Sequence, residues 1–149
     1  MILTVTMNPS VDTRYQLDEL VIDDVNRVTP EKTAGGKGLN VARVLGQLGD
    51  DVVATGLLGG HMGATWLSLW TPTVLTTTLC PSRARLAFAS TSSTPATRPS
   101  CSRAARQLPP TELDAFTAKF TELAGKADVV TISGSLPRGV EAGYYAKIT

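Results

Sequence analysis

The spacing of apolar residues along the chain predicts strands that alternate with helices. Residues 2–7 and 52–58 are short, mainly apolar runs that end in turn-forming residues, as buried strands do. Between them, apolar residues recur every three or four positions over residues 39–48, which predicts a helix closed by Gly49. A strand, a helix and a second strand in this order indicate an α/β fold with a parallel sheet.

The same pattern returns towards the end of the chain. Residues 111–127 have an apolar face at helical spacing, and Thr111 with Asp114 resembles a capping box that would begin this helix. Residues 127–133 then predict a buried parallel strand, and another helix is expected from Tyr144 onward. The chain stops soon after that helix begins, which suggests an artificial or premature end.

Residues 14–32 break the helical pattern. Apolar residues appear there in short bursts that polar residues and aspartates interrupt. This pattern predicts short strands joined by turns, in an antiparallel hairpin or flap.

Residues 65–110 differ in composition from the rest of the chain. No acidic residue lies between Asp51 and Glu112, no lysine lies between Lys37 and Lys119, and the charged residues of the segment are all arginines. A flexible Ser/Thr/Pro linker is one interpretation, although linkers rarely contain the tryptophans and leucines found here. Our hypothesis is that the segment is translated out of frame, which resequencing of the coding DNA would test.

Charge and composition argue against several classes of function. The net charge of +1 gives no electrostatic case for binding nucleic acid or an anionic membrane. No apolar run approaches the roughly 18 residues that a membrane helix needs, and the N-terminus lacks a signal-peptide pattern. Cys80, Cys101 and His61 show no metal-binding spacing. We therefore expect a soluble cytoplasmic protein.

The most informative stretch is glycine-rich and lies at the start of the predicted helix. Gly35-Gly36-Lys37-Gly38 combines glycines, which let the backbone approach a ligand closely, with a lysine and the unpaired N–H groups of a helix N-terminus. This combination is typical of a phosphate or anion site, although a simple connecting turn has the same composition. The stretch lacks the glycine spacing of a Rossmann dehydrogenase, and no Ser or Thr follows Lys37 as in a P-loop NTPase.

Two further positions are candidates for the same site. Asp12 comes just after the first predicted strand, at the edge where open α/β sheets contact ligands, although an aspartate there is as often a turn cap. Ser135 follows Gly134 in a strand-end loop that offers backbone amides and a hydroxyl, a composition that is also typical of an ordinary turn.

These motifs resemble the PfkB (ribokinase-like) carbohydrate kinase family, over residues 1–64 and 108–149. The segments that carry the resemblance are Asn8-Pro9-Ser10-Val11-Asp12, Gly35-Gly36-Lys37-Gly38-Leu39-Asn40-Val41-Ala42, Gly49, Gly59 and Ser133-Gly134-Ser135-Leu136-Pro137. The resemblance implies that residues 1–149 form the N-terminal part of a PfkB kinase domain. The expected fold is a ribokinase-like parallel sheet flanked by helices, with a small β flap over residues 14–32.

The function that the resemblance implies is phosphoryl transfer from ATP, with Mg²⁺, to a hydroxyl of a sugar phosphate. Within the family, the chain looks most like tagatose-6-phosphate kinase, which converts tagatose 6-phosphate to tagatose 1,6-bisphosphate in lactose and galactose catabolism. This finer resemblance rests on Met7–Ser10, Val25–Arg27 and Thr33–Val41. The alternative is 1-phosphofructokinase, which converts fructose 1-phosphate to fructose 1,6-bisphosphate and is similar too.

The resemblance also implies roles for individual residues. Asp12 would accept hydrogen bonds from sugar hydroxyls, and Ser135 is a further candidate for the substrate site. The residues expected to hold the sugar and its existing phosphate are Gly35, Gly36, Lys37 and Asn40. The flap would act as a lid, or pair with the flap of a second subunit in a homodimer.

The sequence departs from the family in one decisive respect. The Gly-Ala-Gly-Asp motif that contains the family's catalytic base does not occur in the 149 residues, and the family's nucleotide site lies in the same missing half. We therefore expect no catalytic residue in this chain and no turnover by the chain alone. A non-catalytic sugar-phosphate-binding fragment and a product without stable function remain as alternatives.

Overall fold

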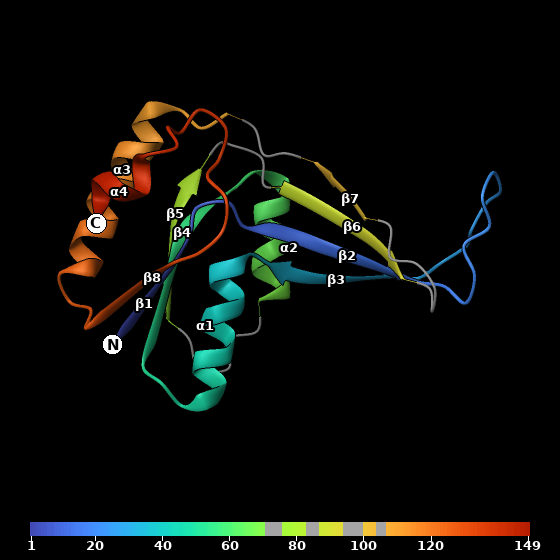
Figure 1. Ribbon diagram of the computed structural model, residues 1–149, viewed down its shortest axis with the longest axis horizontal. Helices are drawn as coiled ribbons and strands as arrows, with labels where there is room; N and C mark the ends of the chain where they lie inside the picture. The colour runs from blue at the N-terminus through green and yellow to red at the C-terminus, as the bar shows by residue number, and fades with distance from the viewer. Residues whose placement is uncertain (71–75, 83–86, 94–99, 104–106) are drawn as a thin grey trace.

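The computed structural model describes residues 1–70, 76–82, 87–93, 100–103 and 107–149, which form two four-stranded sheets (Figure 1). The first sheet has the order β5-β4-β1-β8 and consists of β1 (Ile2–Thr6), β4 (Val52–Gly59), β5 (Thr76–Ser82) and β8 (Val129–Ile132). β1 pairs in parallel with β4 and β8, and β4 pairs in parallel with β5. The predicted parallel sheet is therefore confirmed.

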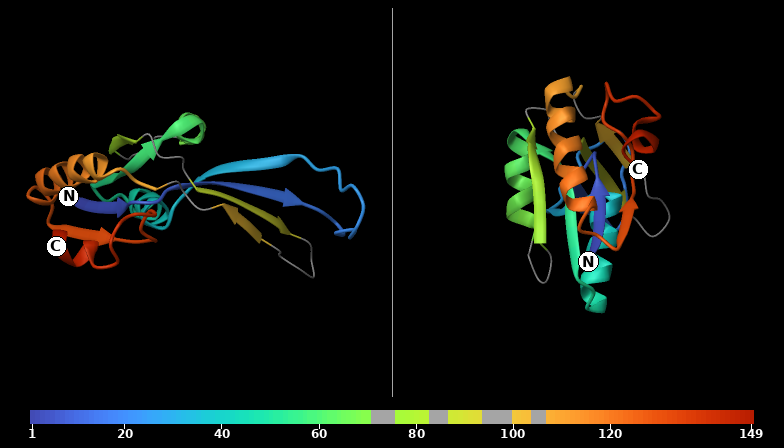
Figure 2. Two further views of the ribbon diagram at one scale, coloured as in Figure 1. Left: turned by 90° about the horizontal axis from the view of Figure 1, so that it is seen from above. Right: turned by 90° about the vertical axis from the view of Figure 1, so that its left-hand side faces the viewer.

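The second sheet projects away from the first and includes the predicted flap (Figure 2). It has the order β3-β2-β6-β7 and consists of β2 (Ser10–Gln16), β3 (Pro30–Gly35), β6 (Ala87–Ser93) and β7 (Ser100–Arg103). β2 and β3 are antiparallel, with Ser10 opposite Gly35 and Tyr15 opposite Pro30. The antiparallel hairpin is confirmed, and residues 17–29 form its far end.

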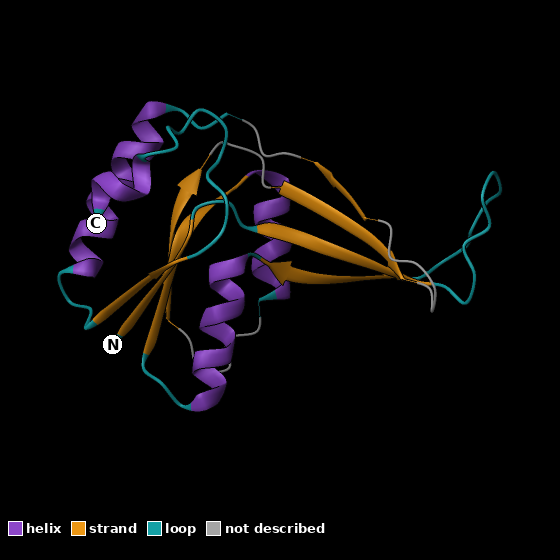
Figure 3. Ribbon diagram, in the orientation of Figure 1, coloured by secondary structure: helices purple, strands orange, loops and turns teal. Residues whose placement is uncertain are grey.

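Helices cover both faces of the parallel sheet (Figure 3). They are α1 (Lys37–Leu48), α2 (Gly60–Leu69), α3 (Pro110–Ala124) and α4 (Tyr144–Ile148). Alternate residues of a strand point to opposite faces, so Val53 of β4 packs with Phe116 of α3, while Ala54 packs with Leu39 of α1. Among the described residues, no helix has the length and apolarity that crossing a bilayer requires.

The predicted helix ends are confirmed, whereas one predicted helix start is wrong. α1 begins at Lys37 and ends at Gly49, whose φ of 90° is left-handed, and α3 ends at Gly125. α3 begins at Pro110 with Pro109 as its N-cap, so the capping box of Thr111 and Asp114 does not form. Proline has no N–H group to satisfy and its fixed φ suits the first helical position, and Thr111 consequently lies inside the helix.

The last strand is parallel, as predicted, but it is not buried. Val129 is 51% exposed and Val130 is 36% exposed, because β8 lies at an edge of the sheet. The prediction treated an apolar run as a central strand, and sheet order cannot be read from such a run alone.

Most of the described residues of the unusual segment 65–110 lie in regular structure. The end of α2 and strands β5, β6 and β7 lie within it, and α2 was not predicted. Residues 71–75, 83–86, 94–99 and 104–106 lie outside the described residues. The presence of these elements does not reveal the reading frame that encodes them, so the out-of-frame hypothesis stays a prediction.

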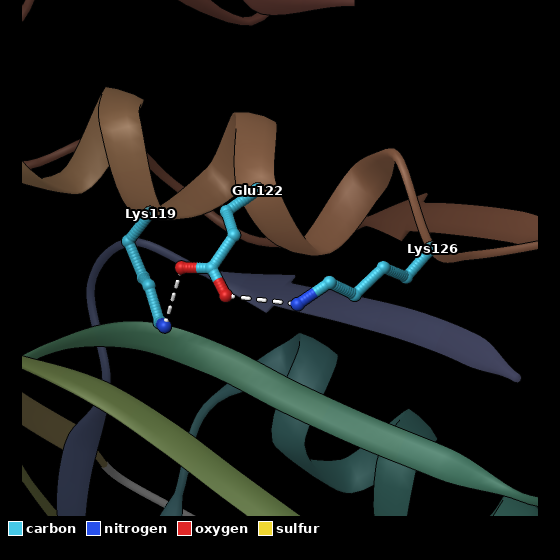
Figure 4. Close-up of polar contacts among 3 residues, drawn as sticks. All are labelled: Lys119, Glu122 and Lys126. Carbon is cyan, nitrogen blue, oxygen red and sulfur yellow. Dashed lines mark hydrogen bonds and ion pairs between the residues drawn. The ribbon is translucent and has the colours of Figure 1, made fainter.

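Three charged side chains form a chain of ion pairs at the end of α3 (Figure 4). Lys119 and Lys126 each donate to the carboxylate of Glu122, at 2.7 and 3.0 Å. The hydrogen bond from Lys119, then the one from Lys126, lowers the pKa of Glu122 from 4.5 to about 2. Glu122 is 49% exposed, so solvent screening limits what these ion pairs contribute to stability.

We expect the stabilising effect of Glu122 to depend on pH. Because its pKa is lower in the folded chain than in the unfolded chain, the contribution is complete above pH 4.5 and is lost as the pH falls through about 2. The difference in unfolding midpoint between the wild type and Glu122→Gln should therefore shrink over this range, and shrink in high salt. Glu19→Gln, at an exposed position on the flap, is the control. A difference that is the same at all these pH values would contradict the prediction.

Candidate functional site

One cavity of about 250 Å³ brings together most of the residues that the sequence singled out. Its lining consists of Asn8, Ser10, Asp12, Gly36, Lys37, Asn40, Gly134 and Ser135. These residues lie after the carboxyl ends of β1 and β8, at the start of β2 and in the first turns of α1. The carboxyl edge of a parallel sheet is the usual place for a ligand in an open α/β fold.

Of the predicted site residues, only Gly35 lies outside this lining. Sequence reasoning did not propose Asn8, Ser10 or Gly134 as site residues, although all of them belong to motifs that carried the family resemblance. Their place in the cavity depends on how β1, β2 and β8 are arranged, which no local pattern reveals.

Asp12 places a carboxylate in the cavity. It lies within β2 opposite Thr33, and not in a turn, so its alternative role as a turn cap does not apply. Ser10 Oγ donates a hydrogen bond of 2.8 Å to Asp12 Oδ1 and thereby holds the carboxylate. The second oxygen, Oδ2, lies against the backbone of Gly35.

Gly35 matters because it has no side chain. A Cβ at this position would lie 2.2 Å from Asp12 Oδ2 and 2.7 Å from Ser10 Oγ. Such distances are far inside van der Waals contact, so any larger residue would displace the Ser10–Asp12 pair. Gly35 therefore shapes the site without lining it.

The N-terminus of α1 supplies positive potential to the cavity. Its N-cap, Gly36, has a φ of 133° and makes no side-chain capping bond, and the first turn contains no acidic residue. The N–H groups of that turn and the helix dipole therefore favour an anion. Lys37, the first residue of the helix, adds a full positive charge and is exposed.

The loop after β8 closes the cavity on another side. Gly134 has a φ of 108°, and a Cβ placed on it would lie 3.7 Å from Lys37 Cβ. Asn8 Nδ2 donates to Ser135 Oγ at 3.0 Å, which ties the loop after β1 to the loop after β8. The cavity thus has a carboxylate from β2, a cationic helix end, and hydroxyl and amide groups from two loops.

Candidate metal ligands do not cluster among the described residues. These residues contain no group of three or more His, Cys, Asp or Glu side chains placed to hold a metal ion. Asp12 is the one carboxylate among the described residues that line the cavity. ATP and Mg²⁺ therefore stay expectations that the family resemblance implies.

The comparisons with known proteins give the family. A model described as pfkB family carbohydrate kinase matches residues 6–149, which is nearly the whole chain. The chain belongs to the pfkB family of carbohydrate kinases. The match confirms the family that the sequence motifs resembled, and it includes the compositionally unusual segment.

Solved structures support the same assignment. A possible 1-phosphofructokinase from Thermotoga maritima has a TM-score of 0.91 and 26% identity, over 99% of this chain and 48% of that chain. Phosphofructokinase-2 from Escherichia coli, in complex with fructose-6-phosphate, has a TM-score of 0.87 and 25% identity, over 99% of this chain and 49% of that chain. Ribokinase from Giardia lamblia, at 16% identity and a TM-score of 0.67, shows the fold alone. This chain spans about half the length of these proteins.

We expect Gly35→Ala to destabilise the fold by about 1–3 kcal/mol, since the new Cβ must push the Ser10–Asp12 pair aside. Thermal or urea unfolding measures the change. Gly143→Ala is the matched control, because a Cβ there meets nothing within 4 Å and no left-handed φ is involved. Equal stability of Gly35→Ala and the wild type would show that the close approach of Gly35 to Asp12 is wrong.

Proposed function

We propose that the cavity binds the sugar phosphate that a PfkB kinase phosphorylates. The observation that carries the proposal is the presence, in one cavity, of the Asp12 carboxylate and the cationic end of α1 with Lys37. A carboxylate accepts hydrogen bonds from sugar hydroxyls, whereas a helix N-terminus and a lysine attract a phosphate. A ligand that carries both groups satisfies both sides of the site.

The residues of this chain would serve the reaction by positioning the acceptor. Phosphoryl transfer depends mainly on aligning the attacking oxygen and neutralising charge, so a firmly held acceptor lowers the barrier. ATP supplies the phosphoryl group in the reaction that the family implies. The 149 residues contain no Gly-Ala-Gly-Asp motif, so we propose no catalytic base among them. Binding of a sugar phosphate without catalysis is the alternative for this chain by itself.

For the sugar, we propose tagatose 6-phosphate, because Met7–Ser10, Val25–Arg27 and Thr33–Val41 resemble tagatose-6-phosphate kinase. Fructose 1-phosphate is supported equally by the similarity to the possible 1-phosphofructokinase of T. maritima. The E. coli neighbour binds fructose-6-phosphate, which adds a third hexose phosphate to the comparison.

We expect sugar phosphates to raise the unfolding midpoint of the chain, because a ligand that binds only the folded state stabilises it. The panel is tagatose 6-phosphate, fructose 1-phosphate and fructose 6-phosphate, with free fructose and inorganic phosphate as comparisons. Lys37→Met and Asp12→Asn should each weaken binding about ten-fold or more, as the loss of a charged hydrogen bond does. Titration calorimetry measures the affinities.

Lys147→Met and Asp114→Asn are the matched controls, since both residues are exposed and lie outside the cavity lining. They should bind like the wild type. The proposed function is wrong if no sugar phosphate shifts the midpoint, or if inorganic phosphate shifts it equally.

We further propose that the flap pairs with a second copy of the chain. Residues 17–29 expose three large apolar side chains, since Val21 is 50%, Ile22 71% and Val25 71% exposed. Asn26 holds this segment together, because its side chain accepts from Val21 N and donates to Val21 O. Apolar groups gathered on an ordered projection are typical of an interface. The E. coli phosphofructokinase-2 has a tetrameric form, which supports assembly within the family.

Sedimentation equilibrium tests the pairing of flaps. We expect the wild type to form a dimer and the double variant Ile22→Asp/Val25→Asp to be a monomer, because each copy would then bury two carboxylates at the interface. Leu67→Asp, at a 55% exposed position on α2, should leave the dimer intact. A wild type that stays monomeric at high concentration would contradict the pairing and favour the lid role instead.

A further inference from the structure

Arg43 lies behind the cavity and contacts one of its lining residues. Its Nη1 donates a hydrogen bond of 2.9 Å to Asn40 Oδ1, one turn earlier in α1. Its Nη2 donates, also at 2.9 Å, to the backbone oxygen of Ala34, at the end of β3. Arg43 does not line the cavity itself. Its route to the cavity is therefore through Asn40.

The contact with Arg43 determines which way the Asn40 amide points. A guanidinium has only donors, so it must face the oxygen of the amide and not the nitrogen. With Oδ1 engaged by Arg43, the Nδ2 group of Asn40 is the part left to serve the cavity that Asn40 lines. Asn40 thereby becomes a hydrogen-bond donor at the cationic end of the site.

Arg43 itself rests on a rigid support. Its guanidinium carbon lies 5.4 Å from the centre of the Trp70 ring, within the range of a cation–π contact. Trp70 stacks on Trp66 at 4.9 Å, and Trp66 is fully buried. Trp66 Nε1 donates to the backbone oxygen of Gly35 at 3.3 Å. Arg43 and Trp66 thus hold the adjacent carbonyls of Ala34 and Gly35, directly before the N-terminus of α1.

We propose that Arg43 is a positioning residue that fixes the Asn40 amide with its NH₂ group towards the ligand. The group that receives this hydrogen bond is an acceptor oxygen of the phosphate or of the sugar, so the inference rests on the proposed function of the cavity. Without Arg43 the amide is free to turn, and its oxygen would then face the anion and repel it.

A double-mutant cycle tests the inference on the 149-residue chain, with fructose 6-phosphate and tagatose 6-phosphate as probes. We expect Arg43→Met and Asn40→Ala each to weaken binding about ten-fold. The double variant should bind no more weakly than Asn40→Ala alone, because Arg43 acts through Asn40. Arg43→Lys, which can reach only one of the two acceptors, should recover part of the affinity. Arg138→Met, an exposed arginine outside the cavity lining, is the control.

A purely structural role of Arg43 gives a different result. In that case Arg43→Met would lower the unfolding midpoint of the ligand-free chain, and its loss of affinity would add in full to that of Asn40→Ala. Full additivity, or unchanged affinity in Arg43→Met, overturns the inference.

A measurement without ligand separates this inference from the proposed function. In the ¹⁵N-labelled ligand-free chain, the Asn40 side-chain amide should give a high heteronuclear NOE in the wild type and a low one in Arg43→Met. Asn40→Ala assigns the signal. If no sugar phosphate binds the wild type, the proposed function fails, while the NOE still decides whether Arg43 orders the amide. An Asn40 amide that is equally ordered in both chains refutes the role of Arg43.

Discussion

The site depends on the close approach of α1 to the strands that precede it. A Cβ on Gly38 would lie 2.4 Å from the backbone oxygen of Val5, so the first turn of the helix sits directly on the end of β1. A Cβ on Gly35 would lie 2.2 Å from Asp12 Oδ2, so the turn before the helix lies equally close to β2. Glycine at both positions lets three elements converge, and the cavity forms where they meet.

This convergence explains which part of the cavity lining could be proposed from the local sequence. The glycines, Lys37 and the helical spacing after them lie within one short stretch, and their chemistry follows from that stretch alone. Asn8 and Gly134 are different, because each becomes a cavity residue only when β1 and β8 pair in register. Pairing across more than a hundred residues leaves no local signal, and only the family resemblance pointed to these segments.

The errors at the end of the chain have physical causes of the same kind. Residues 127–133 predicted a buried strand because valines and isoleucine follow one another, yet β8 lies at the edge of the sheet. The Thr111–Asp114 pattern fits a capping box, yet the prolines before it already set the first helical turn. An apolar run fits both a central and an edge strand, and the order of the sheet decides between them. A capping-box pattern fits both a helix start and a first helical turn, and here the preceding prolines decide. The hypothesis about residues 65–110 stays a prediction, since the pairing of β5 with β4 and of β6 with β2 does not reveal the reading frame that encodes them.

The opposing charges in the cavity bear on what the site selects. A site for phosphate alone would gain nothing from Asp12, because a carboxylate repels an anion. A site for a neutral sugar would have no need of Lys37 and an uncapped helix end. Asp12 would oppose a bare phosphate and Lys37 would add little for a neutral sugar, so the two charges agree with the proposed ligand, which carries both hydroxyls and a phosphate. Arg43 adds to this selectivity, because it turns the Asn40 amide into a donor that favours an anion over a cation at the same end of the cavity.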